Sequence, residues 1–280
     1  MSQVALVAGA SSGLGRHVAA RLAKAGFTVY AGARSFARGA PPPDGCVPVP
    51  LDVTDDASVR EAIRHVLSAG GRIDALVCSA AVLTLGAVEE LAPEELSRVL
   101  EVNVGGMLRM VQAVLPTMRA RGKGRIVLFS SLNGRMAVPF QGAYTASKHA
   151  VEGLAQALRM ETRRYGVSIT VVEPGDCRGG SDAYRGHAAR AEATDSPYRE
   201  TYLAATARIA RDEAQGLSPE RVANAVLSVL TRRRPPARRV VAQPLQRAAL
   251  ALYGILPARW FFRALEWYYG IPVRSPLPKE

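Results

Sequence analysis

A phenol and an ammonium group stand four residues apart at Tyr144 and Lys148. On a helix this spacing places both side chains on one face, within reach of one small volume. A free tyrosine has a pKa of about 10, and a nearby lysine cation lowers it, so the pair predicts general acid–base chemistry. Upstream, the hydroxyl of Ser131 could bind the oxygen of a reacting carbonyl. Two common residues at helical spacing are more often a solvated pair, so this interpretation depends on the rest of the chain.

The amino-terminal segment predicts a dinucleotide-binding unit. The run from Val4 to Ala8 is too short for a helix and has the composition of a buried parallel strand. A glycine-rich turn follows directly, and then an amphipathic stretch from Arg16 to Gly26. Glycines let the backbone approach a pyrophosphate, whose charge is favoured by a helix amino terminus. The residues expected to form this turn around the cofactor are Gly9, Ser11, Ser12, Gly13, Leu14 and Gly15.

The glycine spacing Gly-x-x-x-Gly-x-Gly, combined with Tyr144 and Lys148, resembles the short-chain dehydrogenase/reductase family. The resemblance covers approximately residues 3 to 230, and the motifs follow the family's order and spacing. It implies an α/β fold of the Rossmann type, in which a doubly wound parallel sheet binds a nicotinamide cofactor. The segments from Val29 to Arg34 and from Tyr144 to Leu154 look like the 17β-hydroxysteroid and retinol dehydrogenase branch.

The end of the predicted second strand, Thr28 to Ala33, indicates which cofactor is used. In NAD-binding units an acidic residue near this point accepts the adenosine ribose hydroxyls. Here Ala33 and Arg34 occupy the place, so no carboxylate repels a 2′-phosphate and a guanidinium suited to phosphate contact is present. Ser12 could add a hydroxyl, as in family members that bind NADP. We expect NADP(H); the alternative is that Arg34 is a solvated loop residue.

The resemblance implies further contacts with the adenosine half of the cofactor. The pair Asp52 and Val53 matches the family's Asp-Val pair, whose aspartate approaches the adenine amino group. Ser79, Ala80 and Ala81 lie where the family has an Asn-Ala-Gly turn. The replacement of the asparagine and the glycine puts the usual hydrogen bonding of that turn in doubt, and we expect adjustment rather than loss of binding.

The resemblance also implies a second turn, which would contact the nicotinamide half of the cofactor. Pro174 and Gly175 match the family's Pro-Gly turn beside the nicotinamide, and Cys177 lies in the same loop. The threonine usual at the fifth position after the proline is missing, because Gly179 stands there. Ser181 is a candidate substitute for it.

By the same resemblance, the catalytic set is Asn103, Ser131, Tyr144 and Lys148. Asn103 matches the asparagine that bends the family's fourth helix and holds a water linking the lysine to solvent. Ser131 fits the family's distance to the tyrosine and would stabilise the developing charge on the carbonyl oxygen. Tyr144 would exchange a proton with that oxygen, while Lys148 lowers its pKa and holds the nicotinamide ribose. No metal is expected, because the four histidines show no ligand spacing: His17, His65, His149 and His187.

Strand-like and helical runs alternate through residue 172, which favours a parallel sheet with helices on both faces. With 280 residues and 48% apolar content, the chain can bury one large core. We expect one domain over residues 1–243, including a substrate lid at about 176–215 where periodicity is lost, and a C-terminal helical extension at 244–280. The lid tyrosines that could line a pocket are Tyr184, Tyr198 and Tyr202.

The C-terminal extension is strongly basic and aromatic. From Arg232 onward ten Lys and Arg residues face only two acids, so this part supplies about eight of the twelve net positive charges. Large apolar side chains alternate with the arginines, a composition that suits an anionic membrane surface. Arg247, Pro257, Arg259 and Arg263 interrupt the segment, so it does not predict a membrane span. We favour closure of an apolar substrate pocket or a subunit contact, with peripheral membrane contact second; nucleic-acid binding is not expected.

The remaining expectations concern setting and partners. Three cysteines, Cys46, Cys78 and Cys177, suggest reduced thiols in a cytoplasmic protein, and the first predicted strand leaves no room for a targeting segment. The expected partners are a small apolar carbonyl or alcohol substrate and further copies of the chain, as a homodimer or homotetramer.

The leading hypothesis is an NADPH-dependent oxidoreductase that interconverts an apolar ketone and a secondary alcohol. A different class is a catalytically silent, NADP-binding regulatory or membrane-associated protein with the same fold, which an intact catalytic set disfavours. A third is an epimerase or dehydratase that uses the same tyrosine, although such relatives usually have longer substrate domains.

Overall fold

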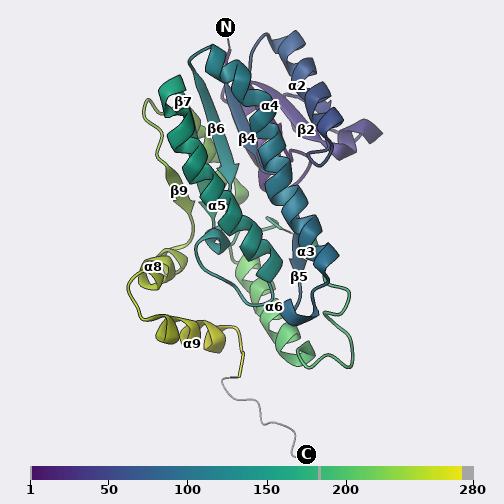
Figure 1. Ribbon diagram of the computed structural model, residues 1–280, viewed down its shortest axis with the longest axis vertical. Coiled ribbons are helices and arrows are strands. Elements are labelled where there is room, and N and C mark those ends of the chain that lie inside the picture. Colours follow the sequence, from purple (N-terminus) through teal and green to yellow (C-terminus); the bar gives the residue numbers. More distant parts are fainter. Residues whose placement is uncertain (1, 182–183, 273–280) are drawn as a thin grey trace, which may run out of the picture.

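A seven-stranded parallel sheet forms the centre of the protein (Figure 1). The computed structural model describes residues 2–181 and 184–272. The strand order is β3-β2-β1-β4-β6-β7-β9, which reverses direction between β1 and β4, so the sheet is doubly wound as the sequence predicts. Its strands are β1 (Val4–Ala8), β2 (Thr28–Ala33), β3 (Cys46–Pro50), β4 (Ala75–Cys78), β6 (Gly124–Phe129), β7 (Val167–Pro174) and β9 (Arg238–Val241).

Helices cover both faces of the sheet. One face packs against α1 (Gly13–Lys24) and α7 (Pro219–Thr231), and the other against α2 (Asp56–Gly70), α4 (Gly106–Ala120) and α5 (Gly142–Thr162). The two hydrophobic cores lie between these layers, because β1 and β4 are buried on both faces and their side chains alternate between the two cores. Short helical segments complete this part: η1 (Arg34–Arg38), η2 (Val88–Glu90), α3 (Pro93–Leu100), η3 (Glu101–Gly105), η4 (Leu132–Gly134) and η5 (Arg163–Tyr165).

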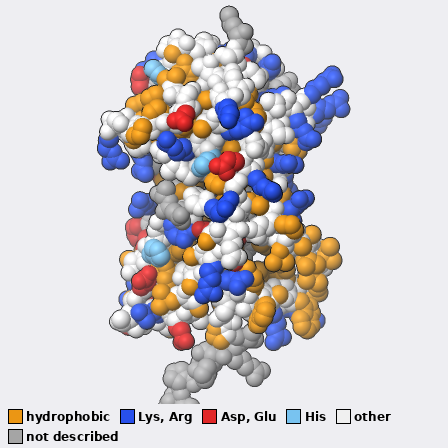
Figure 2. Space-filling model, turned by 180° about the vertical axis from the view of Figure 1, so that it is seen from behind, with side chains coloured by type: hydrophobic (Ala, Val, Ile, Leu, Met, Phe, Trp, Pro, Cys, Tyr) orange, Lys and Arg blue, Asp and Glu red, His pale blue; other side chains and the backbone are white. Residues whose placement is uncertain are grey.

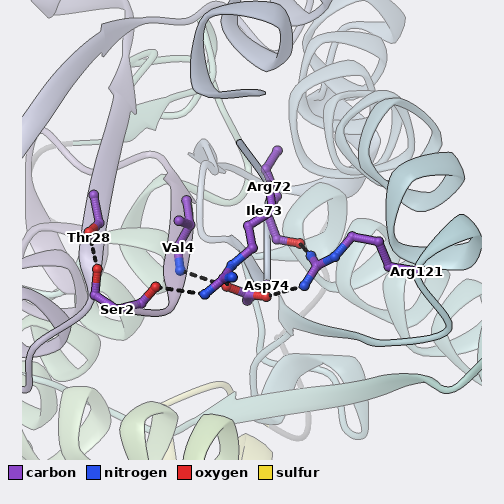
Figure 3. Close-up of polar contacts among 7 residues, drawn as sticks. All are labelled: Ser2, Val4, Thr28, Arg72, Ile73, Asp74 and Arg121. Carbon is purple, nitrogen blue, oxygen red and sulfur yellow. Dashed lines mark hydrogen bonds and ion pairs between the residues drawn. The ribbon is translucent and has the colours of Figure 1, made fainter. Parts of the chain in front are cut away.

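The buried carboxylate of Asp74 connects the amino-terminal ends of β1 and β4 (Figure 3). Oδ2 of Asp74 accepts hydrogen bonds from the backbone N–H of Val4 and from Nε of Arg72, both at 2.9 Å. Its Oδ1 accepts from Nη2 of Arg121 at 2.7 Å, and Nη1 of Arg121 also donates to the carbonyl of Ile73 at 3.2 Å. Burial alone would raise the pKa of Asp74, but these hydrogen bonds and the Arg121 charge hold it below its usual range.

The lid region contains more regular structure than its weak periodicity suggested. Within residues 176–215, β8 (Arg185–His187) pairs in parallel with β5 (Leu83–Leu85), and α6 (Arg199–Ala214) follows. The buried face of α6 consists only of Tyr202, Ala205 and Ile209, so its apolar stripe is too narrow to stand out among the arginines and glutamates around it. The strand β9 was also not foreseen, because it begins with two exposed arginines.

Two helices follow β9: α8 (Pro244–Tyr253) and α9 (Ala258–Tyr268). The expected boundary at residue 243 therefore falls between β9 and α8. The two helices project from the body of the protein below the sheet (Figure 1). Their main anchor is Phe261, which is buried against Leu132 and Met136. Among the described helices, none combines the length and the apolar character that crossing a membrane requires.

Candidate active site

A cavity of about 850 Å³ opens at the carboxyl ends of the strands, where the strand order reverses. Ligands bind at this place in doubly wound sheets. The cavity extends from the glycine turn after β1, past the segment that follows β6, to the helices α8 and α9. The predicted site residues that line it are Gly9, Ser11, Ser12, Leu14, Gly15, Arg34, Asp52, Val53, Ser79, Ala80, Ser131, Tyr144, Lys148, Pro174, Gly175 and Cys177. Gly13 and Asn103 do not line it.

The turn between β1 and α1 has the shape of a pyrophosphate cradle. Gly9 has a φ of +86° and Gly13 a φ of +52°, a conformation that favours glycine. A Cβ at Gly15 would lie 2.1 Å from the carbonyl oxygen of Gly9, so only glycine lets α1 start this close to the strand. Ser12 is the N-cap of α1 and places the free amide groups of the first helical turn at the cavity. The residues present therefore fit a dinucleotide.

The adenosine end of the cavity carries a positive side chain. Arg34 follows β2, is exposed, and lines the cavity together with Asp52. Oδ1 of Asp52 accepts hydrogen bonds from the N–H and the hydroxyl of Thr54, at 2.9 and 2.7 Å. Burial raises the pKa of Asp52, but these bonds and the Arg34 charge together lower it, so the carboxylate is ionised beside the guanidinium.

Ser79, which stands where an asparagine was expected, has a structural role of its own. Its hydroxyl donates to the carbonyl of Ala8 at 2.7 Å, and its backbone N–H donates to the same oxygen at 2.9 Å. A Cβ at Gly9 would lie 2.5 Å from the backbone nitrogen of Ala80, so the two turns are in close contact. Ser79 thus connects the end of β4 tightly to the end of β1.

Asn103 lies at a helical irregularity and is buried. It sits in η3, a π-helical segment that joins α3 to α4, and π-segments of this kind are frequent at functional sites. Its Oδ1 accepts from the N–H of Val82 at 2.8 Å, while its Nδ2 donates to the carbonyl of Val82 at 2.9 Å and to the hydroxyl of Ser147 at 3.0 Å. The side chain therefore fixes the segment after β4 against α5, one residue from Lys148.

Tyr144 and Lys148 lie one turn apart on α5, and Ser131 approaches them from the end of β6. Ser131 is hydrogen-bonded to Tyr144, so the two hydroxyl groups form one polar pair in the cavity wall. Oγ of Ser131 also accepts from the N–H of Asn133 at 3.2 Å. Lys148 is buried, and its Nζ donates to the carbonyl of Phe129 at 2.9 Å. The three side chains that the sequence assigned to catalysis at the cavity are thus in one place.

The pKa values of Tyr144 and Lys148 are shifted mainly by burial, which the spacing of the two residues does not reveal. Burial raises the pKa of Tyr144 above its ordinary value, against the hydrogen bonds from Ser131 and Tyr184, which lower it. Lys148 is not among the causes of this shift; its ammonium group donates to the carbonyl of Phe129 and lies 5.3 Å from the centroid of the Tyr144 ring. Burial lowers the pKa of Lys148 to about 8, partly opposed by the charge of Glu152. The lowering of the tyrosine pKa by the lysine stays a prediction.

The turn after β7 connects the site to the C-terminal helices. Nε2 of Gln246, on α8, donates to Oδ2 of Asp176 at 2.6 Å. A Cβ at Gly175 would lie 2.2 Å from Oε1 of Gln246, so a side chain at this position would displace the Gln246 amide. Burial, with the charges of Glu213 and Asp212, raises the pKa of Asp176 to about 6. Cys177 is buried, and burial raises the pKa of its thiol to about 12.

Of the lid tyrosines that the sequence offers as pocket residues, one lines the cavity and another is packed elsewhere. Of the three lid tyrosines, Tyr184 lines the cavity and is hydrogen-bonded to Tyr144. Tyr202 is instead packed in a small core with Phe140. Ser181, the candidate substitute for the missing threonine, donates its hydroxyl to the Glu213 carboxylate at 2.8 Å. No short motif in the sequence marks three further residues near the site: Asp176, Glu213 and Gln246.

The chain belongs to the short-chain dehydrogenase family, whose model matches residues 3–188, and it is therefore an oxidoreductase. It is 33% identical over 272 residues to a 3-ketodihydrosphingosine reductase from Bacteroides thetaiotaomicron, covering 96% of this chain and 98% of the relative. It is 36% identical to human 17-beta-hydroxysteroid dehydrogenase type 1, covering 84% of this chain and 76% of that protein. A short-chain dehydrogenase structure from Streptomyces avermitilis superimposes with a TM-score of 0.77 at 30% identity, covering 96% of this chain and 97% of the other.

Proposed function

We propose that this protein is an NADPH-dependent oxidoreductase that interconverts an apolar ketone and the corresponding secondary alcohol. The observation that carries the proposal is one continuous cavity, which runs from the glycine turn past Tyr144 to the apolar side chains of α8 and α9. Such a cavity can hold a dinucleotide at one end and a large apolar molecule at the other, with the phenol between them.

The proposed chemistry assigns one task to each side chain. A bound nicotinamide supplies the hydride for the carbonyl carbon. Tyr144 gives its phenolic proton to the carbonyl oxygen, and Ser131, already hydrogen-bonded to Tyr144, donates to the same oxygen as negative charge develops there. Reduction thus adds one hydride to carbon and one proton to oxygen, and oxidation reverses both transfers.

Lys148 would supply positive charge beside the phenol during this proton transfer. Its pKa of about 8 means that the ammonium form is abundant at neutral pH and declines in mildly alkaline solution. Positive charge there would favour the phenolate and so lower the pKa of Tyr144, which is the effect that the spacing of the pair predicts. Asn103 keeps this part of α5 in position through Ser147.

The preference for NADPH rests on Ala33 and Arg34. The turn after β2 offers no carboxylate to the adenosine ribose, and the exposed guanidinium of Arg34 lies at the cavity wall, where a 2′-phosphate would be placed. Ser12 adds a hydroxyl at the same end of the cavity.

The names of the relatives support an apolar substrate. One acts on a ketone with a long hydrocarbon chain and the other on a steroid alcohol, and the first is similar along almost the whole of this chain, including α8 and α9. A substrate of either kind would need a large apolar compartment, and the apolar side chains of α8 and α9 that line the cavity support this part of the proposal.

Steady-state assays test this proposal. Purified protein is mixed with NADPH and a panel of long-chain, steroid, retinoid and small aromatic ketones, and the loss of NADPH absorbance is followed. Turnover of large apolar ketones above the background of a Tyr144→Phe variant supports the proposal. Tight NADPH binding by calorimetry without turnover of any ketone, or oxidation of any alcohol, would instead favour the catalytically silent alternative.

A further inference from the structure

The helices α8 and α9 and the segment between them carry a cluster of large hydrophobic side chains that are exposed. We call this cluster the apolar patch; it consists of Leu252, Ile255, Leu256, Trp260, Phe262 and Trp267. Ile255 is 78% exposed, Trp260 54% and Trp267 81%. Figure 2 shows hydrophobic side chains gathered where the two helices project from the body. Contiguous exposed apolar surface of this kind marks an interaction site.

The patch is continuous with the wall of the active-site cavity. Leu252, Leu256 and Trp267 are exposed and also line the cavity. The same two helices therefore present hydrophobic side chains outward to the surroundings and inward to the substrate compartment. A molecule that leaves an apolar medium at the patch can reach the cavity along apolar side chains without being fully hydrated.

The charges around the apolar patch indicate what kind of surface it contacts. Arg247, Arg259 and Arg263 lie on α8 and α9 and are exposed, whereas Glu266 is the only acid on these two helices. The guanidinium of Arg259 lies 5.4 Å from the ring centroid of Trp260, so a cation and an interfacial aromatic share one position. Arginines beside tryptophans suit the boundary between anionic headgroups and acyl chains.

A second copy of the chain fits this surface less well. In a two-fold dimer formed through the patch, the same surface of both copies would be buried against itself. The arginines of both copies, Arg247, Arg259 and Arg263, would then lie in or beside one contact, and Glu266 is the only acid that α8 and α9 supply to balance them. Like charges in a contact of this kind disfavour association.

We propose that α8 and α9 dock the protein peripherally on an anionic phospholipid bilayer, with the apolar patch inserted at the headgroup boundary and the cavity opening toward the lipid. The arginines contact the headgroups while the tryptophans, Ile255 and Phe262 enter the acyl region. Docking by itself does not depend on the reaction. Delivery of a lipid-dissolved ketone into the cavity rests on the proposed function.

Vesicle flotation measures docking directly. Intact protein is mixed with vesicles of phosphatidylcholine alone or of phosphatidylcholine with phosphatidylglycerol, and the bound fraction is determined at low and high salt. We expect binding to the anionic vesicles that decreases several-fold as salt is raised, and weak binding to the neutral ones. Protein that stays in solution with both vesicle types overturns the proposal.

Matched variants locate the docking surface. Replacing Ile255 and Trp260, which do not line the cavity, with serine should reduce vesicle binding at least tenfold. The control is Met160→Ser on α5, since Met160 is 75% exposed and lies outside the patch; it should bind as the unmodified protein does. Equal binding by both variants would place the contact elsewhere, and so would overturn the proposal. A dimer that Ile255→Ser/Trp260→Ser dissociates, without vesicle binding, would assign the patch to a second copy.

Delivery is tested separately with two ketones. The Ile255→Ser/Trp260→Ser variant should keep its turnover of a short, water-soluble ketone but show a raised KM for a ketone presented in anionic vesicles. Turnover of neither ketone by the unmodified protein would count against the proposed function and leave the flotation result to decide docking. An unchanged KM for the vesicle-borne ketone would show that docking does not deliver substrate.

Discussion

Glu152 on α5 and Glu173 on β7 share a single guanidinium, that of Arg238 on β9. Nε of Arg238 lies 3.1 Å from Oε2 of Glu152 and 3.2 Å from Oε1 of Glu173, and both carboxylates are buried. Arg135 approaches Glu173 from the other side at 3.6 Å. The pair lies directly behind the site, since Glu152 follows Lys148 by one helical turn and raises the pKa of that lysine. A strand that the sequence did not reveal therefore supplies the counter-charge for the catalytic helix.

The Glu173 carboxyl should make stability depend on pH. Burial and the charge of Glu152 raise its pKa from 4.5 to about 7, against Arg135 and Arg238. The folded protein therefore binds a proton that the unfolded chain does not hold between these pH values, and the free energy of unfolding falls as pH rises through this window. In Glu173→Gln this decline should be smaller.

Urea denaturation from pH 5 to 8 measures the effect. The control is Glu161→Gln, because Glu161 is exposed on the same helix α5 as Glu152. If the free energy of unfolding of Glu173→Gln changes with pH as steeply as that of the control, Glu173 is ionised over the whole range from pH 5 to 8.

Asp74 should contribute stability with the opposite pH dependence. Its folded pKa is lowered by hydrogen bonds from Val4, Arg121 and Arg72, so its contribution is complete above the unfolded pKa of about 4 and is lost as pH falls through the folded value. Asp74→Asn keeps the size but removes the charge, and it should reduce the free energy of unfolding by roughly 2 kcal/mol at pH 7. The difference from the unmodified protein should shrink in acid. A constant difference from pH 7 to pH 3 would mean that charge is not the cause.

Removal of the Tyr144 hydroxyl should abolish turnover and leave cofactor binding nearly intact. Tyr144→Phe removes one proton donor and little volume, and acid–base catalysis typically contributes roughly 10²–10⁴-fold. Lys148→Ala should damage both turnover and binding, because the ammonium is proposed to serve the phenol and the ribose. The measurements are kcat with a large ketone and NADPH affinity by fluorescence. Activity of Tyr144→Phe above about a tenth of normal would refute the acid–base role.

The preference for NADPH over NADH should depend on Ala33 and Arg34, which follow Gly32 at the end of β2. NADPH should bind more tightly than NADH, because Arg34 can contact the 2′-phosphate. Combining Ala33→Asp with Arg34→Ala replaces an attractive charge by a repulsive one and should reverse the preference. Calorimetric titration with both cofactors measures this. Equal affinities of the unmodified protein would contradict the assignment.

Local motifs made the sheet and most of the cavity predictable from the sequence. The bounds of β1 and β2 coincide with the apolar runs that predict them, because strands buried on both faces need apolar side chains throughout. The glycine turn and the Tyr144 pair were recognisable because their chemistry requires residue types at fixed spacing. Asp176, Gln246 and Glu173 were not recognisable, since their partners lie 21 or more residues away and only the tertiary fold joins them.

The ammonium of Lys148 illustrates a second limit. Spacing placed it correctly beside Tyr144, but its direction is determined by the carbonyl of Phe129 at the end of β6. A helical repeat gives the face on which a side chain lies, whereas the electrostatic effect depends on which buried group it bonds. For this reason the location of the pair could be predicted and its pKa values could not.

The C-terminal helices should govern the choice between large and small substrates. Leu252, Leu256, Leu265 and Trp267 line the cavity, so their removal takes apolar contact from a bulky ketone but little from a small one. A chain that ends after Ala242 should therefore show a KM raised by roughly tenfold for bulky apolar ketones, since one to two kcal/mol of lost contact has this effect. It should also aggregate, because Leu132 and Met136 lose the cover of Phe261.

A single substitution keeps the test independent of that aggregation. Trp267→Ala removes a side chain that is mostly exposed yet lines the cavity, so the protein should remain soluble. Its KM should rise for a steroid or long-chain ketone and stay constant for a small aromatic one, because only the larger molecules reach α9. Phe262→Ala serves as the comparison, since Phe262 is exposed on the same helix and does not line the cavity. If Trp267→Ala and a soluble truncated protein both retain the normal KM profile, α8 and α9 have no part in holding substrate.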